Sequence, residues 1–374
     1  MRVGLDATPL LGPRSGVGHY VARLTEALAR SGDLAELRLV PFTWRGAGDL
    51  PAAAPTAPAA PAAAVVRCGR RRVPARLLQA AWARVAWPPV ELLAGRVDVF
   101  HATNFVAPPA RRAGLVVTVH DLTYLRYPEM VTASSARYRR LVPAGLARGA
   151  VVCTPTAAVA AEVRDTYRVP AERVVVTPLG VGPQWLAAEP PDAAWLAAHG
   201  LPERYLLFVG SREPRKNLAT LVAACRELPA GAPPLVLAGP PGWGEGLGLE
   251  GLPPGRVHTP GYLADPDLVR VVAGAAVLAF PSWYEGFGLP ALEALACGTP
   301  VVAGDVPALR EVLGDQAELV DPGDAGALAS ALAKAVEDGG GGPARAARRA
   351  RAARFTWEGC ARATLDAYRR AVPR

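Results

Sequence analysis

The chain has 374 residues, of which 51% are hydrophobic and 20% charged. This length exceeds the size at which one hydrophobic core stops growing, so we expect two domains, and the apolar content excludes intrinsic disorder as the main state. Five scattered cysteines without a C-x-x-C spacing fit neither a disulfide framework nor a structural zinc site.

The charge is distributed unevenly along the chain. The net charge of +8 would suit a nucleic-acid or membrane partner. Residues 1–187 carry a net +11, however, residues 188–342 a net −10 and residues 343–374 a net +7. This asymmetry favours two separate domains and argues against a nucleic-acid binder.

Short β-branched runs alternate with longer helical patterns from the first residue onward, as in parallel sheets with crossover helices. The first series of predicted strands comprises Arg2–Asp6, Leu37–Pro41, Val97–Phe100, Leu115–Val119, Ala150–Thr154 and Val174–Pro178. The second series comprises Tyr205–Val209, Pro234–Ala238, Val257–Thr259, Val277–Phe280, Pro300–Ala303 and Ala317–Val320. The sequence therefore predicts an α/β protein with two doubly wound, Rossmann-like units.

No apolar run is long enough to predict a membrane span, and the start of the chain reaches Asp6 too early for an apolar signal core. We therefore expect a cytoplasmic protein. The segment Arg67–Leu93 mixes arginines with Trp82, Trp87 and leucines. This pattern is compatible with peripheral contact at the inner face of the cell membrane, and also with a solvated helix that buries an apolar stripe.

The loop after the predicted strand Val277–Phe280 has the pattern of a phosphate site. Gly286 and Gly288 let the backbone approach a ligand, and Pro290 suits the first turn of a helix whose free N–H groups would face an anion. Glu285 and Glu293 flank this loop and would accept hydrogen bonds from neutral hydroxyls on either side of a phosphate.

Two other interpretations of this loop remain open. The glycines can form a simple turn beside a helix whose dipole attracts a glutamate. The letters GFGLPA also match G-x-G-x-x-A, with Asp305 where a dinucleotide fold needs its ribose-binding acid.

Three cations, Arg212, Arg215 and Lys216, follow the predicted strand Tyr205–Val209 on a short loop. They would neutralise a departing diphosphate, although such charges are also common at a solvated helix entry. Asp265-Pro-Asp267 has the D-x-D spacing of a metal site, but we expect Asp265 to cap a helix there, and we predict no metal.

The run Tyr284–Ala303, followed by Glu311–Asp315 and Asp321–Asp324, resembles glycosyltransferase family 4 of the GT-B superfamily, whose E-x7-E signature matches Glu285 and Glu293. The resemblance implies that Glu285 contacts the donor-sugar hydroxyls and Glu293 the ribose. It also implies that the backbone of Gly286, Phe287, Gly288 and Leu289 contacts the diphosphate and sugar.

Other segments extend the resemblance. The segment Gly12–His19, with Gly16 and Gly18, is similar to the first loop of the family, which approaches the donor phosphate and the acceptor. His120-Asp121 resembles a pair in mannosyltransferase-like members, in which the His reaches the transferred sugar. Arg215 and Lys216 match a variant of the cationic loop, whereas Arg212 stands one residue later than the family's arginine.

The resemblance implies a retaining, metal-independent hexosyltransferase whose catalytic residues are His120, Glu285 and Lys216. It implies an acceptor-binding domain at 1–185, a nucleotide-sugar domain at 186–350 that faces it across a cleft, and a helix at 351–374 that packs back on the first domain. The expected donor is GDP-mannose, no separate cofactor is expected, and the acceptor is a glycan, a lipid-linked or a small-molecule hydroxyl. An NAD-dependent oxidoreductase and a non-catalytic nucleotide-sugar-binding protein remain alternatives.

Overall fold

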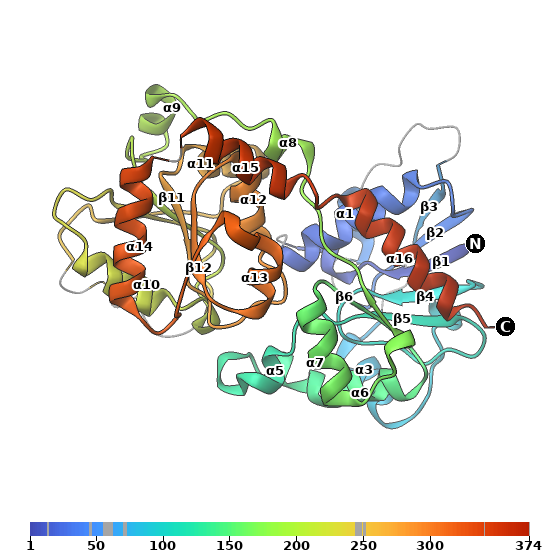
Figure 1. Ribbon diagram of the computed structural model, residues 1–374. Coiled ribbons are helices and arrows are strands. Elements are labelled where there is room, and N and C mark those ends of the chain that lie inside the picture. Colours follow the sequence, from blue (N-terminus) through green and yellow to red (C-terminus); the bar gives the residue numbers. More distant parts are fainter. Residues whose placement is uncertain are drawn as a thin grey trace. The chain divides into compact units, whose positions relative to one another are not determined.

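A computed structural model describes residues 1–12, 15–44, 47–54, 63–69, 73–243, 249, 252–339 and 341–373. The chain divides into two compact units. Unit 1 comprises Met1–Gly180 and Thr356–Arg374, and unit 2 comprises Val181–Phe355 (Figure 1). The predicted boundary at 185/186 falls inside helix α8 (Pro183–Leu186) of unit 2.

Unit 1 contains a seven-stranded parallel sheet in the order β3-β2-β1-β4-β5-β6-β7. Its strands are β1 (Arg2–Asp6), β2 (Glu36–Val40), β3 (Val65–Cys68), β4 (Val99–Ala102), β5 (Gly114–Thr118), β6 (Val151–Thr154) and β7 (Val174–Val176). The central strands are buried, as their β-branched composition predicts. The edge strand β3 was not predicted, because its four residues alternate between exposed and half-buried positions.

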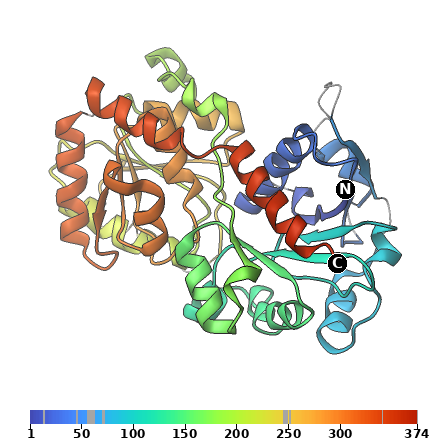
Figure 2. The same cartoon turned by 45° about the vertical axis from the view of Figure 1, so that its right-hand side comes forward.

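The described helices of unit 1 cover both faces of this sheet. They are α1 (Gly16–Arg30), α2 (Leu50–Ala53), α3 (Ala75–Arg84), α4 (Glu91–Ala94), α5 (Thr123–Arg126), α6 (Tyr138–Ala147), α7 (Ala157–Tyr167) and α16 (Trp357–Ala371). Helix α16 lies beside α1 and packs against β5, β6 and β7 (Figure 2). Helices α3, α6 and α7 pack against the strands in an apolar core to which they contribute Leu78, Leu141 and Val159.

Unit 2 contains a six-stranded parallel sheet in the order β10-β9-β8-β11-β12-β13. Its strands are β8 (Leu206–Val209), β9 (Leu235–Ala238), β10 (Val257–Gly261), β11 (Val277–Phe280), β12 (Val301–Gly304) and β13 (Glu318–Val320). Its remaining described helices are α9 (Ala193–Ala198), α10 (Leu218–Glu227), α11 (Asp265–Gly274), α12 (Leu289–Cys297), α13 (Pro307–Leu313), α14 (Ala325–Asp338) and α15 (Gly342–Ala352). The predicted doubly wound architecture is confirmed for both units.

The basic C-terminal segment is divided between the units. Helix α15 packs on α12 of unit 2, where Arg348 donates to the carbonyl of Gly298 at 2.8 Å. Helix α16 belongs to unit 1, and Thr356 caps its start by accepting a hydrogen bond from the N–H of Gly359 at 3.0 Å.

Helix α11 begins one residue earlier than predicted. Ala264 occupies the N-cap position, so the prediction that Asp265 caps the helix was wrong by one residue. Asp265 and Asp267 both lie in the first turn, where carboxylates are stabilised by the helix dipole.

Each strand order reverses direction once, between β1 and β4 in unit 1 and between β8 and β11 in unit 2. Neighbouring strands whose connections run to opposite sides leave a crevice at their carboxyl ends, where ligands of doubly wound sheets bind. The loops at these two reversals are therefore the places to look for chemistry.

Candidate active site

The loops after β8 and β11 are joined by an ion cluster. Lys216 Nζ lies 2.7 Å from Glu285 Oε1, and Arg215 Nη1 lies 2.9 Å from the same oxygen. Arg215 also donates to the Tyr284 carbonyl at 2.6 Å, while its own carbonyl accepts from the N–H of Trp283 at 3.0 Å. The cluster therefore fixes the two loops against each other at the strand reversal of unit 2.

Burial makes this cluster electrostatically strong. Glu285 is 7% exposed and Lys216 8% exposed, and Lys216 Nζ lies 4.6 Å from the centre of the Phe280 ring. Burial alone would raise the pKa of Glu285, but Arg215 and Lys216 outweigh it and lower the pKa from 4.5 to about 2. Glu285 is therefore a carboxylate at neutral pH.

Asn217 fixes the end of the cationic loop, and sequence reasoning missed it. Its backbone has φ +58°, the left-handed region that asparagine tolerates better than most residues. Its side-chain amide donates to the carbonyls of Pro281 at 3.0 Å and Pro322 at 2.6 Å, and its Oδ1 accepts from Thr220 at 2.8 Å. An asparagine directly before a helix was the available signal, although it did not reveal these partners.

Arg212 is the cation of this loop whose charge is not neutralised by a described residue. It forms no ion pair within the described ranges, and its buried Nε has no hydrogen-bond partner there. The neighbouring loop packs closely on it, since a Cβ at Gly242 would lie 2.6 Å from the Arg212 backbone N. A buried guanidinium N–H without an acceptor is the kind of group that an anion satisfies.

Helix α12 begins directly after the glycine loop. Gly288 is its N-cap with φ +89°, a backbone conformation that requires glycine, and a Cβ there would also press on the Leu309 side chain. Ala291 and Leu292 donate to the Gly288 carbonyl. No described residue accepts a hydrogen bond from the N–H of Gly288 or Leu289.

The remaining predicted residues of unit 2 lie around this helix start. Gly286 and Phe287 are buried between Glu285 and Gly288, and the Phe287 ring packs edge-on against Phe355 with centroids 5.8 Å apart. Glu293 is half-buried on α12, four residues after the first residue of that helix, Leu289. The structure thus brings all predicted groups of unit 2 to one strand reversal.

The predicted residues of unit 1 lie on loops at the carboxyl edge of its sheet. His120 Nε2 lies 2.8 Å from the Thr103 carbonyl, which only accepts, so Nε2 carries the proton and Nδ1 is the lone-pair nitrogen. Burial lowers the pKa of His120, so the ring is neutral at pH 7. Tyr20 and Phe105 contact this ring edge-on, with centroids 5.1 Å and 5.6 Å away.

Hydrogen bonds from backbone N–H groups hold the loops that carry the other predicted residues of unit 1. Asp121 Oδ1 accepts from the N–H of Thr123 at 2.9 Å. Gly16 begins α1, and the N–H of Gly18 donates to Ser15 Oγ at 3.4 Å. His120, Asp121, Gly16 and Gly18 therefore belong to unit 1, whereas the other predicted site residues belong to unit 2.

Comparison with known proteins identifies the family. The family model "Glycosyltransferase Family 4" matches residues 14–185, and "Glycosyl transferases group 1" matches residues 194–354. The O-antigen chain mannosyltransferase B of Escherichia coli is 30% identical, and the match covers 99% of this chain and 100% of that protein. The chain belongs to the family 4 glycosyltransferases.

Solved structures of other proteins share the fold of this glycosyltransferase. Sucrose-phosphate synthase from Thermosynechococcus elongatus matches with a TM-score of 0.72 at 22% identity, covering 99% of this chain and 98% of that one. The Anabaena protein HepE in complex with UDP matches with a TM-score of 0.66 at 18% identity, covering 98% and 99%. The predicted GT-B fold is confirmed.

The oxidoreductase alternative is not favoured for this glycosyltransferase. The five residues Pro281–Glu285 separate β11 from Gly286, so the first glycine does not follow the strand as the dinucleotide motif requires. Asp305 forms an exposed ion pair with Arg310, whose Nη2 donates to Oδ2 at 2.6 Å.

The segment Arg67–Leu93 shows both an apolar stripe and exposed apolar residues. Helix α3 buries Leu78 and Trp82 and exposes Leu77, whereas Trp87 lies beyond its end, 59% exposed. Arg67 pairs with Glu36, and the arginines at 70–72 lie outside the described residues. Of the helices in the described ranges, none has both the length and the apolar character needed to cross a bilayer.

Proposed function

We propose that this glycosyltransferase moves mannose from GDP-mannose to an acceptor hydroxyl with retention of configuration, and that it needs neither a metal nor a separate cofactor. The observation that carries the proposal is the strand reversal of unit 2. There, the cations Arg212, Arg215 and Lys216 lie on the loop after β8, while Glu285 and the open amides of Gly288 and Leu289 follow β11.

This arrangement supports binding of a nucleoside diphosphate sugar. The helix start and Arg212 offer hydrogen-bond donors to a diphosphate, and Lys216 and Arg215 add positive charge as the leaving group develops its own. The chain thereby supplies charge stabilisation that a divalent cation provides in other transferases. Glu285, ionised and acceptor-only, fits the hydroxyls of the donor sugar, and Glu293 on α12 fits the ribose.

The choice of mannose rests on sequence. The relative that matches over the full chain is named a mannosyltransferase, and His120-Asp121 resembles the pair of mannosyltransferase-like members. The neutral His120 ring, held by Thr103, Tyr20 and Phe105, presents a fixed Nδ1 acceptor for a hydroxyl of the transferred sugar. We propose that Gly16 and Gly18 bring the first loop close to the donor phosphate and the acceptor.

Thermal-shift measurements with GDP, UDP, dTDP and NAD test the proposal. We expect GDP to stabilise the protein most and GDP-mannose to be consumed when an acceptor is added. A larger shift in melting temperature with UDP or dTDP would indicate a donor that carries that nucleotide in place of GDP. Stabilisation by NAD would refute the transferase mechanism at this site.

We further propose that the protein acts in the cytoplasm and that the Arg67–Leu93 surface makes peripheral membrane contact. The support is that Leu77 is 70% exposed and Trp87 59% exposed near the arginines Arg76 and Arg84 of α3. Flotation with anionic liposomes should recover the wild type and lose the double variant Leu77→Ser, Trp87→Ser. Equal recovery of both proteins, or of neither, would remove the membrane contact.

A further inference from the structure

We propose that the Asp6 carboxylate, at the strand reversal of unit 1, binds a hydroxyl of a neutral sugar acceptor. The proposal rests on the transferase function above and names the acceptor class. Asp6 is the last residue of β1, directly at the β1/β4 reversal, where a doubly wound sheet binds ligands. Neither the sequence motifs nor the site residues discussed so far include it.

One oxygen of Asp6 is fixed and the other is open. Oδ1 accepts from the N–H of Thr8 at 2.9 Å and from its hydroxyl at 2.6 Å. The Thr8 hydroxyl in turn accepts from the N–H of Phe42 at 2.8 Å, which holds Thr8 in place. Oδ2 accepts no hydrogen bond within the described part of the chain, and the residue keeps 7% exposure. The carboxylate is thus oriented by its own loop, with one acceptor atom left over.

A short hydrogen-bond chain connects Asp6 to His120. The Thr103 hydroxyl donates to the Asp6 carbonyl at 2.7 Å, and the Thr103 carbonyl accepts from His120 Nε2 at 2.8 Å. Asp6 and His120 therefore lie at the same edge of the sheet, on either side of the loop after β4. An acceptor held by Asp6 would lie on the side of unit 1 that carries the proposed sugar-contacting histidine.

Aromatic rings complete this edge. Phe105 adopts φ +62°, a strained conformation for a bulky residue, and stacks on Tyr138 with centroids 4.5 Å apart. Burial raises the pKa of the Tyr138 hydroxyl, and the nearby carboxylates of Asp6 and Asp121 raise it further. A phenol O–H and ring faces beside a carboxylate are the mixture of apolar and polar groups typical of small-molecule sites.

The electrostatics select the class of ligand. Within the described ranges no cation pairs with Asp6, unlike Glu285 in unit 2. A ligand carboxylate or phosphate placed at Oδ2 would be repelled when Asp6 is ionised. A hydroxyl instead donates its hydrogen to that oxygen, so the chemistry fits a neutral polyhydroxyl acceptor.

The test uses the full chain with GDP present and measures binding of methyl glycosides by saturation-transfer NMR. The probes are the methyl glycosides of mannose, glucose and galactose, with methyl glucuronoside as the anionic control. We expect wild type to bind a neutral glycoside and to discriminate against the glucuronoside. Asp6→Asn keeps the Oδ1 acceptor for Thr8. It should raise the Kd of the neutral glycosides at least about tenfold and reduce the ratio between the affinities for neutral glycosides and for the glucuronoside.

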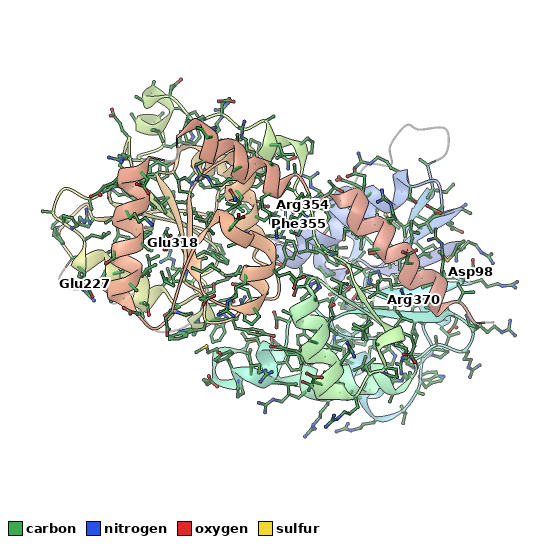
Figure 3. All side chains as sticks on the ribbon, in the orientation of Figure 1. Asp98, Glu227, Glu318, Arg354, Phe355 and Arg370 are labelled. Atoms are coloured by element: carbon green, nitrogen blue, oxygen red, sulfur yellow. The ribbon has the colours of Figure 1, made fainter. Side chains whose placement is uncertain are left out.

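Two further proteins separate this role from a structural one. Asp98, labelled in Figure 3, accepts from the N–H of Arg2 at 2.7 Å before the start of β4, at the opposite edge of the same sheet. Asp98→Asn is therefore the matched control and should bind all glycosides as wild type does. Thr8→Val removes the hydroxyl that orients Asp6, and it should weaken neutral binding while leaving the discrimination intact.

Donor measurements make the two possible failures distinguishable. If wild type neither binds GDP nor consumes GDP-mannose, the proposed function fails whatever the glycosides do. If GDP binds equally to wild type and Asp6→Asn but neutral glycosides also bind both equally, the role of Asp6 is overturned while the transferase stands. Failure of wild type to bind any neutral glycoside in the presence of GDP would also overturn it.

Discussion

Replacing Asp6 by asparagine should stabilise unit 1 at neutral pH. Burial raises the pKa of the Asp6 carboxyl from 3.8 to about 6, against the opposing hydrogen bonds from Thr8. Between these two pH values the folded state keeps a proton that the unfolded chain has released. Raising the pH therefore removes stability, which is fully present below pH 3.8 and lost as the pH passes 6.

The magnitude follows from the shift. A difference of about two pKa units, at ~1.4 kcal/mol each, makes ionised Asp6 cost about 3 kcal/mol near pH 7.5. The cost at about pH 4.5 is only about 1 kcal/mol, because the folded carboxyl is then still protonated. Asparagine cannot ionise, so its free energy of unfolding lacks this pH dependence. The stability of Asp6→Asn relative to wild type should therefore increase by about 2 kcal/mol when the pH is raised from about 4.5 to about 7.5.

Native-state hydrogen exchange of peptides from β1, followed by mass spectrometry, measures the stability of unit 1 alone. It does not require the whole chain to unfold in one step. Variant and wild type are compared at the same pH, so intrinsic exchange rates cancel. A variant that is no more stable than wild type near pH 7.5, or a difference equal at both pH values, would refute the raised pKa.

Three substitutions test the proposed donor and catalytic roles. Lys216→Ala should lower turnover by about a hundredfold or more while the fold persists, because Arg215 still pairs with Glu285 at 2.9 Å; full activity, measured as release of GDP, would exclude the diphosphate role. Glu293→Ala should raise the Kd of GDP-mannose by about tenfold in calorimetry, and an unchanged Kd would remove the ribose contact. His120→Ala should lower kcat far more than donor affinity; a loss of thermal stability with normal kcat in the folded fraction would make His120 structural.

The strands could be predicted from sequence because buried parallel strands are continuous β-branched runs. The glycine loop and the start of α12 could be predicted as well, since Gly288 and Pro290 have narrow backbone preferences. Local chemistry determines these features, so a short window of sequence is sufficient. Strand β3 lies at an edge and is half exposed, and its window carries no such signal.

The interactions that determine charge in the site could not be predicted. Lys216 and Glu285 are 69 residues apart, and only the pairing of β8 with β11 brings them together. Glu285 was expected to face only ligand hydroxyls, but in the structure it also neutralises two cations. The sequence predicts Asp6 only as the last residue of a strand, although a charged residue at the carboxyl end of a buried parallel strand is itself a signal of a binding site.

The two strand reversals show how the same residue type takes different roles. Glu285 lies between two cations and has a pKa of about 2, whereas Asp6 has no described cation and a pKa of about 6. Unit 2 is acidic overall, yet at its reversal Arg215 and Lys216 pair with Glu285, and Arg212 lies on the same loop as these two cations. Unit 1 is basic overall, yet its reversal presents Asp6, and Asp121 lies in the loop after the next strand, β5. The net charge of a unit therefore does not predict its ligand, and the local balance of charge at each reversal supports the two proposals made above: a diphosphate in unit 2 and neutral hydroxyls in unit 1.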